Sequence, residues 1–364
     1  MLELPDFPWD TIAAETARAR SHPDGFVDLS VGSPVDPTPQ VVLEALATAG
    51  DAHGYPTTIG TPALREAMID WWHRRRGAAG LTVDDVIPSI GSKEFIALLP
   101  LALGLGPGDI VVHPELAYPT YEVGAVAVGA TPLAADDPAD WPAGTRLIWL
   151  NSPGNPDGRV LDAAALRAAI ARARELGAVI VSDECYAELN WAADEPTPSI
   201  LDADVLGERR DDVLAIASLS KQSNLAGYRA ALVAGDRARI RQIVQVRKHL
   251  GLMTPSPVQT AMTAALGDDA HVAAQRAVYL ERRRILSRAL LNAGFVIDES
   301  TAGLYLWTSR GEPARETLAF LADLGILVAP GDFYGPRGAR HVRVALTASD
   351  ADIREAAARL ALLA

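Results

Sequence analysis

The sequence lacks the features that mark secreted, membrane-bound or nucleic-acid-binding proteins. Its 364 residues include one cysteine, Cys185, so no disulfide can form within the chain. The longest apolar stretch, residues 95–106, is broken by a proline and a glycine and is shorter than the ~20 residues of a membrane span. Residues 1–10 lack the basic and apolar regions of a signal peptide, and the net charge of −13 disfavours non-specific nucleic-acid binding. We therefore expect a cytoplasmic protein with no nucleic-acid or membrane partner.

The chain does contain a regular alternation of short apolar runs and helical patterns. The pattern predicts strands at 86–90, 109–113, 147–150, 179–183, 213–218 and 230–234, with helices between several of them. This alternation is typical of an α/β fold with a mostly parallel sheet flanked by helices. From about residue 255 the pattern changes, and a long helix at 271–292 leads into shorter strands and helices. We expect a large domain at 37–250 and a smaller α+β domain formed by 1–36 and 251–364.

The most informative segment follows the strand predicted at 213–218. It places Ser218, Ser220 and Lys221 at the strand's end, with Arg229 eight residues beyond the lysine. Burial disfavours the charged form of a lysine, and an uncharged amine can form a Schiff base with a carbonyl. Two hydroxyls and a guanidinium can bind a phosphate. An aldehyde that carries a phosphate fits this set, and pyridoxal 5'-phosphate (PLP) is the common cofactor of that description.

Two other interpretations of this segment stay open at this point. A lysine after a strand is most often a solvated loop residue. Ser218 and Lys221 also match the Ser-x-x-Lys pair of penicillin-binding proteins, but the accompanying Ser-Asp-Asn and Lys-Thr-Gly tripeptides do not occur in the sequence. Residues elsewhere in the chain are therefore needed to distinguish a PLP site from these two interpretations.

Further polar residues follow other predicted strands. Asp183 ends one strand and could pair with a pyridine nitrogen, with Tyr186 three residues later as a donor to a ring oxygen. Asn155 lies in the Pro- and Gly-rich loop 151–158, which is rigid enough to present its amide. The ordinary interpretations of these residues are a helix cap, a core tyrosine and a plain turn. Because strand ends share one edge of an α/β sheet, we expect these residues to form one site with Lys221.

Four more residues are candidates for the same site. Ser92 and Lys93 stand between a strand and a helix, where backbone amides bind phosphate well. Tyr118 follows another strand and is placed to stack on an aromatic ligand, unless it belongs to the core. Arg343 lies inside an apolar strand and needs an anionic partner, either a substrate carboxylate or an internal salt bridge.

These residues, in this order, resemble the class I/II aminotransferases of PLP fold type I over nearly the whole chain. The resemblance is carried by Ser218-Leu-Ser-Lys221 with Leu225–Arg229, by Asn151–Pro156, by Asp183–Tyr186 and by Tyr55–Pro62. It implies a PLP-dependent transaminase with no metal and with a smaller α+β domain beside the large one.

The resemblance also implies a role for each residue. Lys221 would bind the cofactor and move the proton, Asp183 would pair with the pyridine nitrogen, and Asn155 and Tyr186 would contact the ring hydroxyl. The phosphate would be held by Ser92, Lys93, Ser218, Ser220 and Arg229, with Tyr118 stacked on the ring. Gly32 and Arg343 would receive the substrate α-carboxylate. Tyr55 would reach the phosphate of the neighbouring subunit, so a homodimer is implied. Lys93 departs from the small residue often found at its position, and no arginine for a distal carboxylate is evident.

More narrowly, the chain resembles the actinobacterial N-succinyl-diaminopimelate aminotransferases of lysine biosynthesis. Five segments carry this resemblance: 7–10, 28–37, 113–121, 220–229 and 329–335. It implies glutamate and 2-oxoglutarate as one substrate pair and an anionic amino or keto acid as the other. Extra cations would then be needed, with candidates in Arg247–His249 and Arg337. Another fold type I enzyme remains the alternative, either an aromatic or branched-chain aminotransferase or a carbon–sulfur lyase, because fold alone does not fix the reaction.

Overall fold

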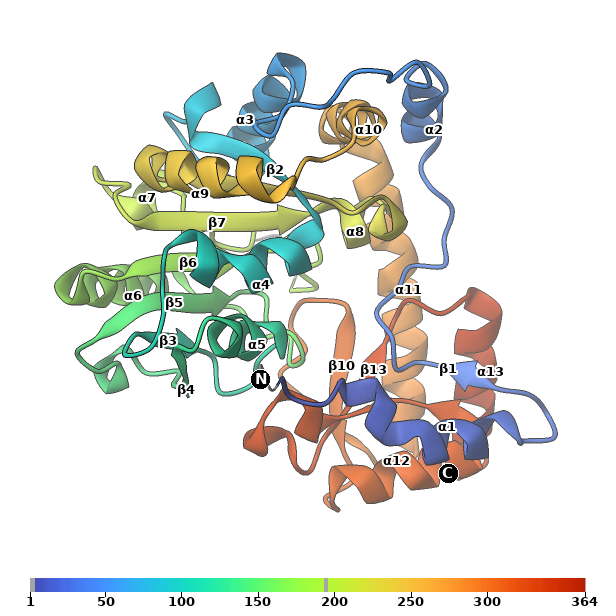
Figure 1. Cartoon of the computed structure of the whole chain (residues 1–364). Helices are drawn as coiled ribbons and strands as arrows, with labels where there is room; N and C mark the ends of the chain where they lie inside the picture. Colours follow the sequence, from blue (N-terminus) through green and yellow to red (C-terminus); the bar gives the residue numbers. More distant parts are fainter. Residues whose placement is uncertain (1–3, 193–195, 364) are drawn as a thin grey trace.

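A seven-stranded sheet forms the centre of the larger part of the molecule (Figure 1). The computed structural model describes residues 4–192 and 196–363. The strands lie in the order β2-β8-β7-β6-β5-β3-β4. Their bounds are β2 (Val86–Ile90), β3 (Ile110–His113), β4 (Thr131–Ala134), β5 (Thr145–Asn151), β6 (Val179–Asp183), β7 (Val213–Ser218) and β8 (Ala230–Gly235). Strands β4, β3, β5, β6 and β7 pair in parallel, and β8 pairs antiparallel with both β7 and β2. The predicted α/β fold with a mostly parallel sheet is confirmed.

Helices cover both faces of this sheet because its strands are apolar on both sides. On β5, Ile148 and Trp149 point to opposite faces and belong to different apolar cores. One core contains side chains of α3 (Pro62–Arg76), α6 (Ala163–Leu176), α7 (Ala203–Leu206) and α10 (Ser256–Leu266). The other contains side chains of α4 (Gly91–Ala102), α5 (Thr120–Ala127) and α9 (Arg237–Leu250). The predicted cap of α6 is present, since the Asp162 carboxylate accepts from the Ala165 amide at 2.7 Å.

The C-terminal part is built around an antiparallel sheet in the order β12-β13-β10-β9. Its strands are β9 (Val296–Asp298), β10 (Tyr305–Ser309), β12 (Ala329–Pro330) and β13 (Val342–Ala345). Strand β1 (Val27–Asp28) pairs in parallel with β11 (Ile326–Leu327), so the N-terminal segment lies against this part. The helices here are α1 (Ala13–Arg20), α12 (Ala314–Asp323) and α13 (Asp350–Ala361).

The long helix α11 (Ala270–Asn292) runs beside both parts (Figure 1). It contacts α8 (Leu219–Gln222) at one end of the large sheet, and it packs on α13 and β9 of the C-terminal part. Helix α2 (Gln40–Ala47) packs against α10. None of the helices in the described parts of the chain is long and apolar enough to cross a lipid bilayer.

Candidate active site

The carboxyl ends of the central strands bring the predicted residues together. Asn151 at the end of β5 lies in register with Asp183 at the end of β6, and Ser218 ends the neighbouring strand β7. These ends open on a cavity of about 450 Å³. All the predicted site residues except Tyr55 line it: Gly32, Ser92, Lys93, Tyr118, Asn155, Asp183, Tyr186, Ser218, Ser220, Lys221, Arg229 and Arg343. The arrangement agrees with the rule that α/β sheets bind ligands at the carboxyl ends of their strands.

Lys221 reaches the cavity from the short helix α8, which follows β7 directly. Ser218 caps this helix, and its hydroxyl accepts from the Ser220 amide at 3.1 Å. The Lys221 amine donates a hydrogen bond to the backbone carbonyl of Gly32. Burial lowers the pKa of Lys221, because the ammonium form loses hydration in the cavity. The amine can therefore act as a base or a nucleophile closer to neutral pH than an exposed lysine.

Asp183 presents a buried carboxylate that accepts hydrogen bonds from uncharged donors. Its Oδ2 accepts from the Tyr121 hydroxyl at 2.8 Å, and its Oδ1 accepts from the Cys185 amide at 3.1 Å. Burial raises the pKa of Asp183. A carboxylate in this position favours a cationic ligand group, such as the protonated nitrogen of a pyridine ring.

Hydroxyls, a guanidinium and a helix start form an anion cradle at one end of the cavity. Helix α4 begins at Gly91, and Ser92 and Lys93 follow in its first turn. A Cβ at Gly91 would collide with the Arg229 guanidinium, so glycine allows Arg229 to lie against this helix start. The Ser218 and Ser220 hydroxyls are 2.9 Å apart beside them. Backbone amides, hydroxyls and a guanidinium at one helix start suit a phosphate group.

Arg343 also lines the cavity and comes from β13. It is buried and donates to the Asn155 side-chain oxygen at 2.9 Å and to the Ser30 carbonyl at 2.7 Å. The ion pairs formed within residues 4–192 and 196–363 do not include Arg343, so the internal salt bridge considered from the sequence is not found there. Neutral partners leave the charge of a buried guanidinium free to bind a carboxylate.

The other predicted residues that touch the cavity are held by local contacts. The Asn151 side-chain oxygen accepts from the Asn155 amide at 2.8 Å, which fixes the loop after β5. Tyr118 packs edge-on against Tyr121 at 5.9 Å, and burial raises the pKa of Tyr118 to about 12. The hydroxyl of Tyr186 lies 3.1 Å from that of Tyr305. Roles for these residues stay predictions.

Several candidates lie elsewhere. Tyr55 is 96% exposed and does not line the cavity. Arg247 pairs with Glu94 at 2.7 Å, and Arg337 pairs with Glu115 at 2.7 Å. Neither arginine lines the cavity that contains Lys221. A role for Arg247–His249 or Arg337 in binding a distal carboxylate stays a prediction.

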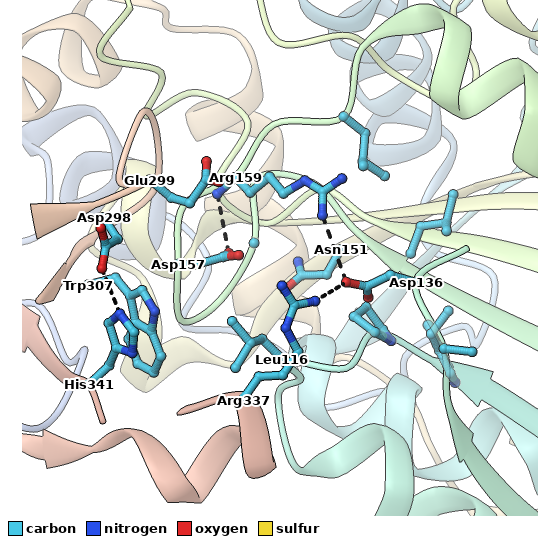
Figure 2. A pocket seen from close by; sticks show the side chains of 16 residues that line it. Leu116, Asp136, Asn151, Asp157, Arg159, Asp298, Glu299, Trp307, Arg337 and His341 are labelled. Atoms are coloured by element: carbon cyan, nitrogen blue, oxygen red, sulfur yellow. Dashed lines mark hydrogen bonds and ion pairs between the residues drawn. The ribbon is translucent and has the colours of Figure 1, made fainter. Parts of the chain in front are cut away.

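Arg337 instead lies in a second cavity of about 400 Å³ (Figure 2). There, Arg337 and Arg159 both point toward Asp136, at 3.0 and 3.8 Å. His341 stacks on Trp307 and pairs with Asp298 at 2.7 Å. These pairs already engage the basic side chains that line this cavity.

Sequence reasoning missed Tyr305, Tyr121 and Trp9. Tyr305 and Trp9 line the cavity, and Tyr121 bonds to Asp183. Tyr121 lies three residues from Tyr118, which is helical spacing, so the turn around Tyr118 carried a usable signal. Trp9 comes from a short helix at Pro8–Ile12, far from the other residues in sequence, and only the tertiary fold places it.

Comparison with known proteins gives a consistent family. A family model described as aminotransferase class I and II matches residues 24–360. The 4-dedimethylamino-4-oxo-anhydrotetracycline transaminase OxyQ of Streptomyces rimosus is 53% identical, with 99% of this chain and 100% of that protein covered. The probable aminotransferase Rv1178 of Mycobacterium tuberculosis is 54% identical, with 98% and 85% covered. The solved N-succinyldiaminopimelate aminotransferase of M. tuberculosis is 26% identical and superposes with a TM-score of 0.87, covering 98% of this chain and 97% of that one.

Proposed function

This chain belongs to the class I and II aminotransferases, and from that premise we propose that it is an N-succinyl-LL-2,6-diaminopimelate:2-oxoglutarate aminotransferase. It would exchange an amino group between glutamate and N-succinyl-2-amino-6-oxopimelate, in the formation of diaminopimelate and lysine. The main observation in support of an aminotransferase is that the Lys221 amine shares one cavity with the buried Asp183 carboxylate and the buried Arg343 guanidinium. A cytoplasmic homodimer is part of this proposal.

The family is PLP-dependent, and the residues of the cavity fit that cofactor. When bound, PLP supplies an aldehyde that accepts the amino group and a ring that withdraws electrons from the substrate. Asp183 would face the pyridine nitrogen, and the cradle of Ser92, Lys93, Ser218, Ser220 and Arg229 would hold the phosphate. Asn155 and Tyr186 would contact the ring hydroxyl, and Tyr118 would lie against the ring face.

Lys221 has the properties of the proton carrier. Its lowered pKa leaves more of the amine unprotonated than in an exposed lysine, so Nζ can take the proton from the substrate α-carbon and pass it on. The Gly32 carbonyl that accepts from this amine belongs to the segment before α2, which also lines the cavity. That contact orients Nζ toward the place where a substrate would bind.

The substrate α-carboxylate would bind Arg343 and the backbone near Gly32. A guanidinium can grip a carboxylate with two parallel hydrogen bonds, which fixes the orientation of the α-carbon. Both proposed substrates carry further carboxylates. The likeness to the solved M. tuberculosis enzyme supports the succinylated substrate.

A second candidate is favoured by the similarity to OxyQ. That protein is named for an anhydrotetracycline ketone, and it is 53% identical to this chain over 99% of the length of this chain. A large ketone acceptor in place of the succinylated keto acid would leave the residues proposed to bind PLP unchanged. Aromatic or branched-chain transamination and carbon–sulfur bond cleavage are further reactions that this fold can support.

Reductive trapping followed by a substrate panel tests the proposal. The chain has three lysines, Lys93, Lys221 and Lys248, so peptide mapping after borohydride treatment identifies the attachment point without ambiguity. We expect the label on Lys221 alone, and we expect Lys221→Ala to lose at least ~10³-fold in turnover, since covalent and proton-transfer roles vanish together.

The panel separates the substrates. Glutamate and N-succinyl-LL-diaminopimelate should each convert the visible absorption band of the cofactor to that of its amine form, whereas tyrosine, leucine and cystathionine should not. Conversion by an aromatic or branched donor, or pyruvate and ammonia from cystathionine, would overturn the substrate assignment. A label on Lys93 or Lys248 would overturn the site itself.

A further inference from the structure

Two buried tyrosines from different parts of the chain meet beside Lys221. Tyr186 follows β6 of the large sheet, and Tyr305 begins β10 of the C-terminal sheet. Their hydroxyl oxygens are 3.1 Å apart, and both side chains are buried. Both residues line the cavity that contains Lys221. Tyr186, which is proposed to contact the ring hydroxyl of the cofactor, is therefore within hydrogen-bonding distance of a second hydroxyl, that of Tyr305.

Tyr305 is held in place on two sides. The Arg343 guanidinium carbon lies 3.8 Å from the centroid of its ring, which is a close cation–π contact. On the other side, the Tyr305 hydroxyl lies directly against Gly32, and a Cβ at that glycine would overlap the hydroxyl oxygen. The carbonyl of the same Gly32 accepts the hydrogen bond of the Lys221 amine. Tyr305 thus has little freedom to turn away from Tyr186.

The surroundings shift the pKa values of the two hydroxyls in opposite directions. Burial acts to raise the pKa of Tyr305, but the nearby cations Arg343 and Lys221 outweigh it, and the pKa is lowered. Burial raises the pKa of Tyr186 well above its usual range. Either hydroxyl could be the donor in this pair. A hydroxyl has one proton, so if Tyr186 gives its proton to the ring oxygen of a bound cofactor, Tyr305 must be the donor to Tyr186.

We propose that Tyr305 is a positioning residue that directs the hydroxyl proton of Tyr186 toward the ring oxygen of the bound cofactor, and so lowers the pH at which the cofactor–lysine linkage at Lys221 loses its proton. The inference rests on the proposed cofactor contact of Tyr186 and is independent of the substrate. A hydrogen bond donated to the ring oxygen favours its anionic form, and a chain of two such bonds is stronger than one.

A spectrophotometric pH titration of the holoenzyme, with no substrate present, tests this inference. Removing the Tyr305 hydroxyl with Tyr305→Phe keeps the ring that packs on Arg343. The midpoint of the visible absorption change should rise by about 0.5–1 pH unit, the equivalent of one hydrogen bond of ordinary strength. A midpoint that stays put or falls overturns the proposal.

Two control variants isolate the hydroxyl pair. Tyr334 also packs on Arg343, at 5.0 Å, but its buried hydroxyl has no hydrogen-bond partner among the described residues. Tyr334→Phe should leave the midpoint unchanged, and an equal shift would show that ring packing on Arg343 is the cause. In a Tyr186→Phe background, Tyr305→Phe should add no shift, because Tyr305 acts only through Tyr186.

The remaining outcomes are also decisive. If Tyr305→Phe unfolds, as thermal unfolding of the apo-protein would reveal, the hydroxyl has a structural role and the proposal is wrong. If wild-type protein shows no visible cofactor band, the proposed function fails before this inference is reached. A normal wild-type band with an additive shift in the double variant contradicts the Tyr305 inference alone.

Discussion

At the Asp183 carboxylate, the proposed contact with the cofactor and the stability of the apo-protein place opposite demands on the charge. It is buried at the end of β6, where it accepts from a tyrosine hydroxyl and a backbone amide. Because burial raises its pKa, ionising this group costs more free energy in the folded apo-protein than in the unfolded chain, where the pKa is near its ordinary value. Stability from this group is therefore complete below the unfolded pKa and is lost as the pH rises through the higher folded pKa.

Asp183→Asn should accordingly stabilise the apo-protein at pH 7. We expect a gain on the order of 1 kcal/mol, or about 1–2 °C in Tm, that disappears below about pH 4, where both forms of the site are neutral. Added PLP should raise the Tm of wild type more than that of the variant, since the variant has lost the partner of the pyridine nitrogen. Differential scanning fluorimetry from pH 4 to 8, with and without PLP, measures both effects.

Asp157 provides the matched control. It lines the second cavity, and burial raises its pKa as well. Asp157→Asn should also stabilise the apo-protein but should leave the PLP-induced rise in Tm unchanged. An equal loss of the PLP effect in both variants would contradict the pairing of Asp183 with the cofactor.

For single residues, the sequence predicted a place in the site best where the residue stands at the end of a strand. Lys221, Asp183 and Asn155 all follow buried apolar runs, and parallel strands place such ends at one edge. Tyr305 gave no such signal, because a tyrosine inside a strand is equally common in a core. Its place in the site depends on the contact between the C-terminal part and Tyr186, far away in the sequence, which no local pattern records.

Among the elements, helix α3 is tied to the site through a buried ion pair. Arg76 in its last turn donates to Glu184 Oε2 through two nitrogens, at 3.1 and 2.8 Å. Oε1 of the same glutamate accepts from the Ser199 hydroxyl and the Ile200 amide. Glu184 directly follows Asp183, so this network anchors the segment that leaves β6.

Glu184→Gln should be strongly destabilising. Removing one charge of a fully buried pair leaves the Arg76 guanidinium uncompensated, and such changes cost about 3–5 kcal/mol. Urea unfolding followed by circular dichroism should show the loss as a lower midpoint. The exposed pair of Arg18 and Asp323 is the control, and Arg18→Ala should cost less than about 1 kcal/mol. Equal losses at both pairs would show that burial is not what makes the first pair important.

The bounds of helices and strands could also be predicted best where the sequence contains a buried apolar run. The runs 86–90, 179–183 and 213–218 were predicted as strands, and β2, β6 and β7 occupy the same residues. Helix α9 was not predicted, although Ile240, Ile243, Val244 and Arg247 are its buried residues and have helical spacing. Strand β4 was also missed, because it lies at the sheet edge and none of its residues is buried. Apolar continuity identifies buried strands, which include β2 at the other edge of the sheet, but not an edge strand without buried residues such as β4.

For the whole molecule, two arrangements are predicted: the division into domains and the assembly of two subunits into a homodimer. The sequence predicted domains at 37–250 and at 1–36 with 251–364, and this division stays a prediction. Tyr55 is 96% exposed, and the apolar side chains of Val31, Val35 and Leu43 are exposed as well. Exposed apolar side chains of this size fit an interface with a second copy of the chain, in which Tyr55 would enter the partner's site.

Mixing two inactive variants tests that arrangement. In a heterodimer of Lys221→Ala with Tyr55→Ala, a partner-shared site places Lys221 of one subunit beside the intact tyrosine of the other. One of the two sites is then complete, so heterodimers purified with two different tags should recover about half the wild-type activity per dimer. If Tyr55 instead acts within its own subunit, neither site is complete and the heterodimer stays as inactive as the parents. Sedimentation equilibrium on the same preparations checks that dimers form, and a monomeric wild type would overturn the shared site outright.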